Sequence, residues 1–374
     1  MKCHRELQLY NKVSRMLSRM SLKRKTLALV TFFGMAIAMT AILQFFACQC
    51  TLAPPAVMYY MKAAAVSYPE EPPLGWTRVD FKARVVLSLT TMPENVQTLP
   101  ETLDSLLKQT FKADAIYVTL PEKNARTGEK YPNPEWEDFY AGSTPEITIV
   151  KPKKDYGPLC KLAGALMKEP DPNTVIITVD DDKIYSESMV SKLVWHTHND
   201  PKKAFGPCGF SFLPTFKPRG IVPVYAMWRM RGKGLYTDEL QACCGNLYRR
   251  GFFDMEEGEE GSYNGLLDPP KACFTTDDLW IAGNLAMSKI PRVLIGGVGG
   301  ETLGGWGGKD LRGWDPITPS WKLNQGAASN TLSSINSKAG KDVSCVEAVE
   351  QRFGQKWHRV MNYIRDAHNE VTNL

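Results

Sequence analysis

The sequence predicts an α/β fold in which a mostly parallel sheet is flanked by helices. Short runs rich in β-branched residues, such as 84–91 and 174–179, alternate with amphipathic stretches of helical length up to about residue 200. Strands that alternate with helices are joined by crossovers, which cover both faces of a parallel sheet. With 374 residues and 43% hydrophobic content, the chain is long enough for one large domain or two small ones.

The individual elements follow from the same patterns. Strands are expected over 84–91, 115–121, 147–150, 174–179 and 291–297. Helices are expected over 98–110, 157–168, 186–198, 275–290 and 343–367. Thr98 and Glu101 have the spacing of a capping box, as do Thr275 and Asp278, and Pro100 fits a helical first turn. Residues 299–340 are rich in Gly, Ser and Asn and are expected to form loops.

The N-terminal part of the chain differs in charge and hydropathy from the rest. Residues 1–25 hold eight Lys or Arg against Glu6 alone, so they carry +7, and the formal total of +5 leaves about −2 elsewhere. Residues 26–48 carry no charge and are long enough to span a bilayer as a helix. We therefore expect a cytoplasmic basic tail, a transmembrane signal anchor and a Pro-rich stem over 49–80. A cleaved signal peptide or a buried helix is the alternative.

This layout is that of a single-pass type II membrane protein. The positive-inside rule places the tail in the cytoplasm and residues 81–374 across the membrane, in the Golgi lumen if the source is a eukaryote. Because the basic excess lies in the tail, nothing in the composition indicates a nucleic-acid surface. Six of the nine cysteines follow the stem, where an oxidising lumen permits disulfides, but their pairing cannot be read from the sequence.

Three adjacent carboxylates, Asp180, Asp181 and Asp182, follow the hydrophobic run 174–179. Two like charges about 5 Å apart repel by roughly 3 kcal/mol at an effective dielectric near 20, so water or a bound cation must relieve them. On an extended chain, Asp180 and Asp182 point the same way. Ligands of α/β sheets bind beyond the carboxyl ends of the strands, which favours a site here over a simple acidic turn.

Three segments in order resemble the family 2 glycosyltransferases with the GT-A fold. The first is "LSLTTMPENVQTLPETLDSLLKQTFKADAIYVTLP", residues 87–121. The second, "VDDD" at 179–182, resembles the family's DXD-type metal motif, and the third, "TTDDLWIAG" at 275–283, resembles its later acidic motif. The similarity covers about residues 84–296. It implies a nucleotide-binding half over about 84–200, an acceptor half over about 201–298, and loops and a helix over 299–374.

The resemblance implies a hexosyltransferase that uses a nucleotide-diphospho-sugar, with a UDP-sugar expected. Asp180 and Asp182 would bind Mn²⁺ or Mg²⁺, which take oxygen ligands and neutralise the leaving diphosphate. Asp180 would also lie near the ribose, and Asp181 would share either task. Asp278 would be the general base that deprotonates an acceptor hydroxyl, with Asp277 supporting it, so that transfer inverts the anomeric centre. The acceptor would be a glycan, a glycoprotein or a glycolipid.

Four further residues are candidate donor contacts. Thr90 and Thr91 end the first strand, where related enzymes hold the nucleobase, although polarity at a strand end explains them nearly as well. Asp155 and Lys161 flank a predicted helix start, and helix N-termini attract phosphate. A plain helix cap with a surface lysine is the alternative for this pair.

Several residues and two other functions stay open at this point. Trp280 would either stack on an acceptor sugar or pack in the core. Arg249 and Arg250 would either bind phosphate or have an ordinary role on the protein surface. A non-catalytic carbohydrate-binding protein on a degenerate GT-A fold is one alternative function. A sugar nucleotidyltransferase is another, although that class usually has a Gly-rich loop after its first strand, and "LSLTTMPENV" has no glycine.

Overall fold

The computed structural model describes residues 65–67, 72–207, 209–212, 221–223, 233–242, 245–253, 265–295, 308–310 and 341–357. The predicted basic tail, the predicted anchor and most of the predicted stem lie outside these residues. So does most of the 299–340 segment. None of the helices described is long and apolar enough to cross a membrane. All the described residues belong to one compact unit, 63–374.

The main sheet contains nine of the described strands. Their order is β1-β10-β13-β7-β12-β5-β2-β3-β4. In chain order they are β1 (Ala65–Ser67), β2 (Val85–Thr90), β3 (Ala115–Thr119), β4 (Glu146–Val150), β5 (Val175–Thr178), β7 (Ala204–Gly206), β10 (Lys233–Thr237), β12 (Asn246–Arg249) and β13 (Arg292–Ile295). This arrangement confirms the expected α/β class and all five predicted strands.

The sheet is parallel in one half and mixed in the other. Strands β5, β2, β3 and β4 pair in parallel, as do β7 and β13. Strand β12 enters between β5 and β7 and is antiparallel to both, and β10 is antiparallel to β13 and β1. Only β10 and β12 are reversed among these nine strands, so the sheet is mostly parallel in direction although half of its pairings are antiparallel.

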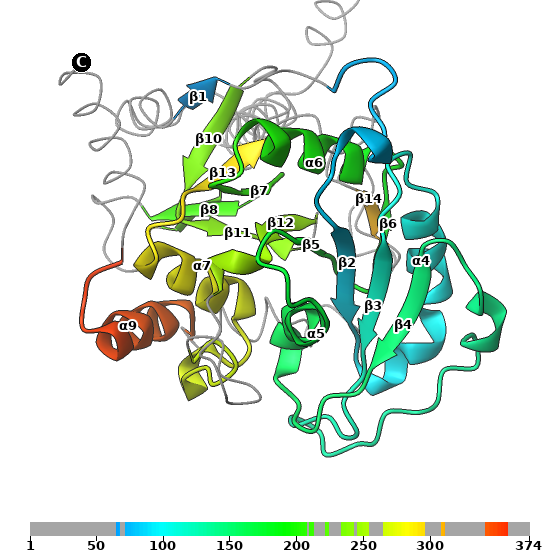
Figure 1. The fold of residues 1–374 in the computed structure, drawn as a ribbon. Helices are drawn as coiled ribbons and strands as arrows, with labels where there is room; N and C mark the ends of the chain where they lie inside the picture. The colour runs from blue at the N-terminus through cyan, green and yellow to red at the C-terminus, as the bar shows by residue number, and fades with distance from the viewer. Residues whose placement is uncertain are drawn as a thin grey trace, which may run out of the picture. The chain divides into compact units, whose positions relative to one another are not determined.

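Helices cover both faces of the parallel half (Figure 1). They are α4 (Pro100–Leu107), α5 (Cys160–Lys168) and α6 (Met189–Asn199), whereas α7 (Asp277–Met287) and α9 (Lys341–Phe353) pack against each other. Strand β2 shows why two layers form, because Val85, Leu87 and Leu89 point into the core shared with α4 and α6. The alternate side chains, including Val86 and Ser88, point to the other face, against which α5 packs.

Two smaller sheets are built from short strands that no pattern in the sequence predicts. One has the order β11 (Glu239–Leu240), β8 (Gly209–Phe212), β9 (Ile221–Pro223). The other pairs β6 (Lys183–Tyr185) with β14 (Gly308–Asp310). Strand β6 begins directly after Asp182, so the three carboxylates form the connection between two strands.

Both predicted capping boxes are wrong. Thr98 ends the 3₁₀ helix η2 (Pro93–Thr98), and its hydroxyl donates to the carbonyl of Asn95 at 2.9 Å, while Leu99 is the N-cap of α4. Thr275 precedes the N-cap of α7 and accepts a hydrogen bond from the Lys341 ammonium at 3.0 Å. The Thr98 hydroxyl is hydrogen-bonded within the 3₁₀ helix, and the Thr275 hydroxyl is hydrogen-bonded to α9. The other prediction, that Pro100 lies in the first turn of α4, is confirmed.

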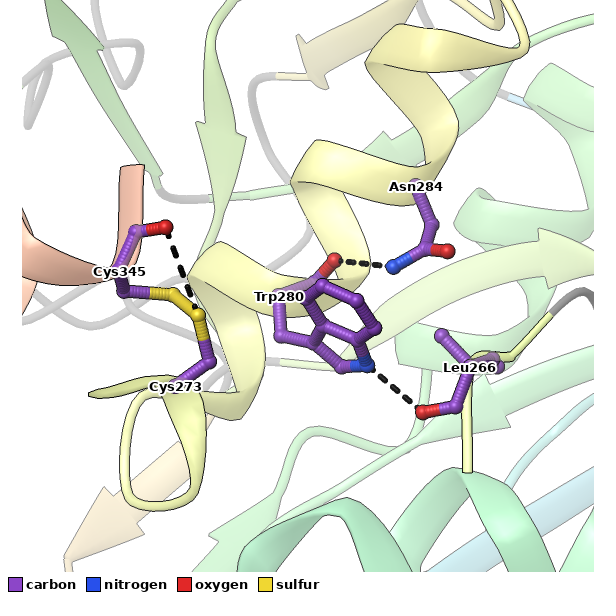
Figure 2. Close-up of a disulfide and its surroundings, with 5 residues drawn as sticks. All are labelled: Leu266, Cys273, Trp280, Asn284 and Cys345. Carbon is purple, nitrogen blue, oxygen red and sulfur yellow. Dashed lines mark hydrogen bonds between the residues drawn. A yellow bond between two sulfur atoms is a disulfide. The ribbon is translucent and has the colours of Figure 1, made fainter. Parts of the chain in front are cut away.

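A disulfide joins the segment that precedes α7 to α9. Cys273, in the 3₁₀ helix η8 (Lys271–Cys273), bonds to Cys345 across 72 residues (Figure 2). Beside it, the indole N–H of Trp280 donates to the carbonyl of Leu266 at 2.7 Å, and the Trp280 side chain is fully buried. Trp280 is therefore a core residue of the α7–α9 layer and does not stack on a sugar.

Candidate active site

The carboxyl ends of β2 and β5 form one edge of the sheet. Ser88 lies opposite Thr178, so the residues that follow each strand emerge side by side. The hydroxyl of Thr91 donates to the carboxylate of Asp181, and the hydroxyl of Thr102 in α4 donates to the Asp181 carbonyl at 2.9 Å. The structure thus places Thr91 with the predicted acidic segment, which it anchors from the neighbouring strand.

Asp180, Asp181 and Asp182, hereafter the sheet-edge acids, form the turn from β5 into β6. The backbone N–H of Asp180 donates to the Tyr185 hydroxyl at 2.8 Å, which closes the turn. The Asp180 side chain is 28% exposed, and an Asp182 oxygen lies 3.9 Å from the Lys183 ammonium. These carboxylates reach solvent at the edge of the sheet, where α/β folds bind their ligands.

Lys161 connects the sheet-edge acids to the later acidic motif. Its ammonium lies 2.8 Å from an oxygen of Asp180 and 3.2 Å from an oxygen of Asp277, and its side chain is only 8% exposed. Burial alone would lower the pKa of Lys161, but the carboxylates of Asp180, Asp277 and Asp278 outweigh it and raise this pKa well above its usual value. Lys161 is therefore a charged, buried bridge between segments about 100 residues apart.

Asp277 and Asp278, hereafter the helix-start acids, open α7. Carboxylates are favoured in a helical first turn because the N-terminal end of the helix dipole is positive. One oxygen of Asp278 accepts the backbone N–H of Ala242 at 3.3 Å. The Asp277 side chain is 8% exposed. Through Lys161, the structure brings the start of α7 beside Asp180.

Glu239 in β11 is a site neighbour that the sequence did not reveal. Its side chain is buried, and burial followed by the charges of Asp278, Asp342 and Asp277 raises the pKa of its carboxyl well above the usual value. The only hint of this residue in the sequence is that Asp238 and Glu239 are adjacent, and an acidic pair without a predicted strand before it does not indicate a site.

Two predicted donor contacts have structural partners. Asp155 accepts the backbone N–H groups of Ala125 at 2.6 Å and Gly157 at 2.7 Å, so its carboxylate fixes the loop before α5. Thr90 donates its hydroxyl to the carbonyl of Thr119 at 2.7 Å. None of the hydrogen bonds recorded for Asp155 and Thr90 joins either side chain to the sheet-edge acids.

The remaining candidates are accounted for by packing. Arg250 is buried and donates to the carbonyl of Glu169 at 3.1 Å, and Arg249 donates to the carbonyl of Asn173 at 3.1 Å. These contacts support neither phosphate binding nor a purely surface role for the two arginines. His196 packs against the Phe205 ring while His198 stacks on Trp195, so the two histidines face different surroundings.

The sheet-edge acids suit a hard divalent cation by their donor chemistry. Mg²⁺ and Mn²⁺ take oxygen ligands, and they commonly use only one or two carboxylates together with phosphate oxygens. Within the described part of the chain, no three residues among His, Cys, Asp and Glu converge as a metal-holding group. A site completed by the diphosphate of a ligand would need only Asp182 and a second oxygen.

Comparisons with known proteins gave structural similarities only. No protein-family model and no curated protein matches the chain. The chain is similar to the mannosyltransferase PcManGT from Pyrobaculum calidifontis, solved with GDP-Man and Mn²⁺, with 15% identity, a TM-score of 0.42, and coverage of 83% of this chain and 86% of that one.

Two nucleotidyltransferase-type structures are also similar. For 4-diphosphocytidyl-2C-methyl-D-erythritol synthase the identity is 11%, the TM-score 0.34, and the coverage 58% of this chain and 89% of that one. For a putative glucose-1-phosphate thymidylyltransferase from Bacillus anthracis, the values are 10%, 0.33, 56% and 85%. Because these scores are low, we base the function on the residues of this chain.

Proposed function

We propose that this protein is a metal-dependent glycosyltransferase of the GT-A, family 2-like type. It would transfer a sugar from a nucleotide-diphospho-sugar, with a UDP-sugar as the first donor to test, to a hydroxyl of a glycan, glycoprotein or glycolipid. The observation that carries the proposal is the meeting of two acidic segments around Lys161 at the carboxyl edge of the sheet. One segment suits the donor, and the other suits the acceptor.

The sheet-edge acids would hold the donor. Asp182 and Asp180 are the proposed ligands of Mn²⁺ or Mg²⁺, which supplies positive charge against the diphosphate as it leaves. Thr91 fixes Asp181 and so keeps the turn in place. Asp180 would also lie near the ribose of the donor. Thr90 and Asp155 would act by shaping the loops around the nucleobase.

Asp278 would act as the general base. A carboxylate at a helix start, held by the Ala242 N–H, can accept the proton of an acceptor hydroxyl while that oxygen bonds to the anomeric carbon. The bond from that carbon to the donor diphosphate breaks, and the nucleoside diphosphate leaves. A single base on the acceptor side corresponds to direct displacement with inversion, and Asp277 would support Asp278.

The cellular placement is also part of the proposal. The uncharged 26–48 segment after a basic tail would make the protein a type II membrane protein with the site in a lumen, the Golgi in a eukaryote. The Cys273–Cys345 disulfide agrees with an oxidising compartment. Protease protection of residues 81–374 in intact microsomes would test this, and digestion without detergent would contradict it.

The test is release of nucleoside diphosphate from a panel of UDP- and GDP-sugars by the full-length protein, with and without Mn²⁺. Slow metal-dependent hydrolysis of one donor, accelerated by an acceptor glycan, supports the transferase and identifies its donor. Pyrophosphate release from a nucleoside triphosphate and a sugar phosphate would instead indicate a nucleotidyltransferase. Glycan binding with no metal-dependent nucleotide binding would indicate a carbohydrate-binding protein.

A further inference from the structure

The two acidic segments differ in how many groups hold them in place. The sheet-edge acids are fixed by the Thr91 hydroxyl, the Thr102 hydroxyl and the Tyr185 hydroxyl, in addition to Lys161. Asp277 has one recorded ion pair among the described residues, and its partner is Lys161 at 3.2 Å. Its Oδ2 atom is buried and accepts no hydrogen bond. Removing Lys161 would therefore disturb Asp277 far more than the sheet-edge acids.

The backbone around Lys161 also docks onto the start of α7. Gly157 has a φ of +64°, and a Cβ added there would lie 3.1 Å from both the ring and the carbonyl oxygen of Phe274. This close approach places the start of α5 against the residues just before Asp277. The ion pair is thus part of a packed junction and not a chance contact of a flexible side chain.

Burial separates Lys161 from a direct role in donor binding. Its side chain is 8% exposed, and its ammonium is already directed at Asp180 and Asp277. A diphosphate contact would require the ammonium to leave a buried carboxylate without its counter-charge, which is strongly unfavourable. The bridge is therefore more consistent with a role that acts through the two carboxylates.

From this geometry we infer that Lys161 is a positioning residue that sets the helix-start acids against the donor site. By holding Asp277 beside Asp180, it fixes the first turn of α7 and hence the distance between Asp278 and the sheet edge. The inference rests on the proposed function, and it changes the role first expected for Lys161, that of a diphosphate contact. Lys161 would affect turnover without touching the donor.

The experiment compares Lys161→Met, Asp277→Asn and the double variant in the full-length protein. Lys168→Met is the matched control, because Lys168 lies on the same helix and is exposed. Four quantities are measured: kcat, the KM for the donor, the Kd for UDP with Mn²⁺, and the urea midpoint of unfolding.

We expect Lys161→Met to lower kcat about 100-fold, the scale of a small misplacement of catalytic groups, with KM and Kd changed by less than about threefold. The double variant should have a kcat no lower than Asp277→Asn alone and a higher urea midpoint than Lys161→Met, because the unpaired buried carboxylate is gone. Lys168→Met should match the wild type.

Two results would overturn the inference. A raised Kd with an unchanged kcat at saturation would make Lys161 a donor contact, and multiplied losses of kcat in the double variant would show that it does not act through Asp277. If the wild type binds no nucleotide with Mn²⁺, the proposed function fails instead. In that case the urea midpoints alone test the bridge. If the shifts caused by Lys161→Met and Asp277→Asn do not add in the double variant, the bridge is supported, and if they add, it is refuted.

Discussion

The sheet-edge acids and the helix-start acids are both carboxylate clusters, yet the fold treats them differently. Asp180 is 28% exposed at the end of a parallel strand, and hydroxyl groups from two neighbouring elements hold its turn. Asp277 is 8% exposed and depends on one buried ammonium. The first arrangement leaves oxygens accessible to a cation, whereas the second keeps Asp277, the neighbour of the proposed base Asp278, away from solvent and dependent on Lys161. A transferase needs both environments within one site.

The largest expected effect separates the two segments by kinetics. Asp278→Asn should lower kcat by about 10²–10⁴-fold, the usual contribution of a general base, because the amide cannot accept the acceptor proton. Donor binding should persist, since the proposal gives Asp278 no contact with the donor. Steady-state transfer assays with calorimetry of UDP and Mn²⁺ would check this. Loss of nucleotide binding in this variant would contradict the division of roles.

Removing the disulfide should affect the helix-start side alone. For a loop of 72 residues the chain-entropy relation gives about 4 kcal/mol of stabilisation. Cys273→Ala/Cys345→Ala should lose that free energy of unfolding, as measured by urea denaturation without reductant. An unchanged stability of the oxidised wild type on reduction would show that the bond does not constrain α9.

Acid should weaken the fold through α6, independently of both acidic segments. Burial lowers the pKa of His196 to about 4. The unfolded chain takes up the proton below its ordinary value near 6.5, so stability falls by about 3 kcal/mol as the pH drops from 6.5 to 4. His196→Gln should remove this dependence in urea unfolding, and the exposed His198→Gln should keep it. Equal slopes in the two variants would contradict the assignment to His196.

The smallest effect concerns the packing of α7 on α9. A Cβ at Gly283 would lie 2.7 Å from Cγ1 of Val349, so Gly283→Ala should cost about 1–3 kcal/mol of overpacking. Adding Val349→Ala removes the clashing methyl groups, and the double variant should be less destabilised than the sum of the single ones. Additive losses in thermal unfolding would show that the two helices are not in this contact.

The parallel half of the molecule was predictable because its signals are local. The β-branched runs at 84–91 and 174–179 became β2 and β5, and Pro100 marked the first turn of α4. Apart from β13, the strands of the mixed half and those of the smaller sheets were not predictable, since short strands such as β7 and β11 exist only through their long-range partners. The same limit applied to Lys161, whose distance from Asp277 depends on the docking of α5 against α7, and to Thr98 and Thr275, whose hydroxyls found other partners.

The most direct test is titration of Mn²⁺ into the full-length protein, followed by electron paramagnetic resonance, with and without UDP or GDP. If a metal–diphosphate complex completes the sheet-edge acids, one of these nucleotides should tighten Mn²⁺ binding in the wild type and not in Asp182→Asn, whose far-ultraviolet circular dichroism should stay unchanged. Equal Mn²⁺ binding by the two proteins, or no response to either nucleotide, would contradict the donor site.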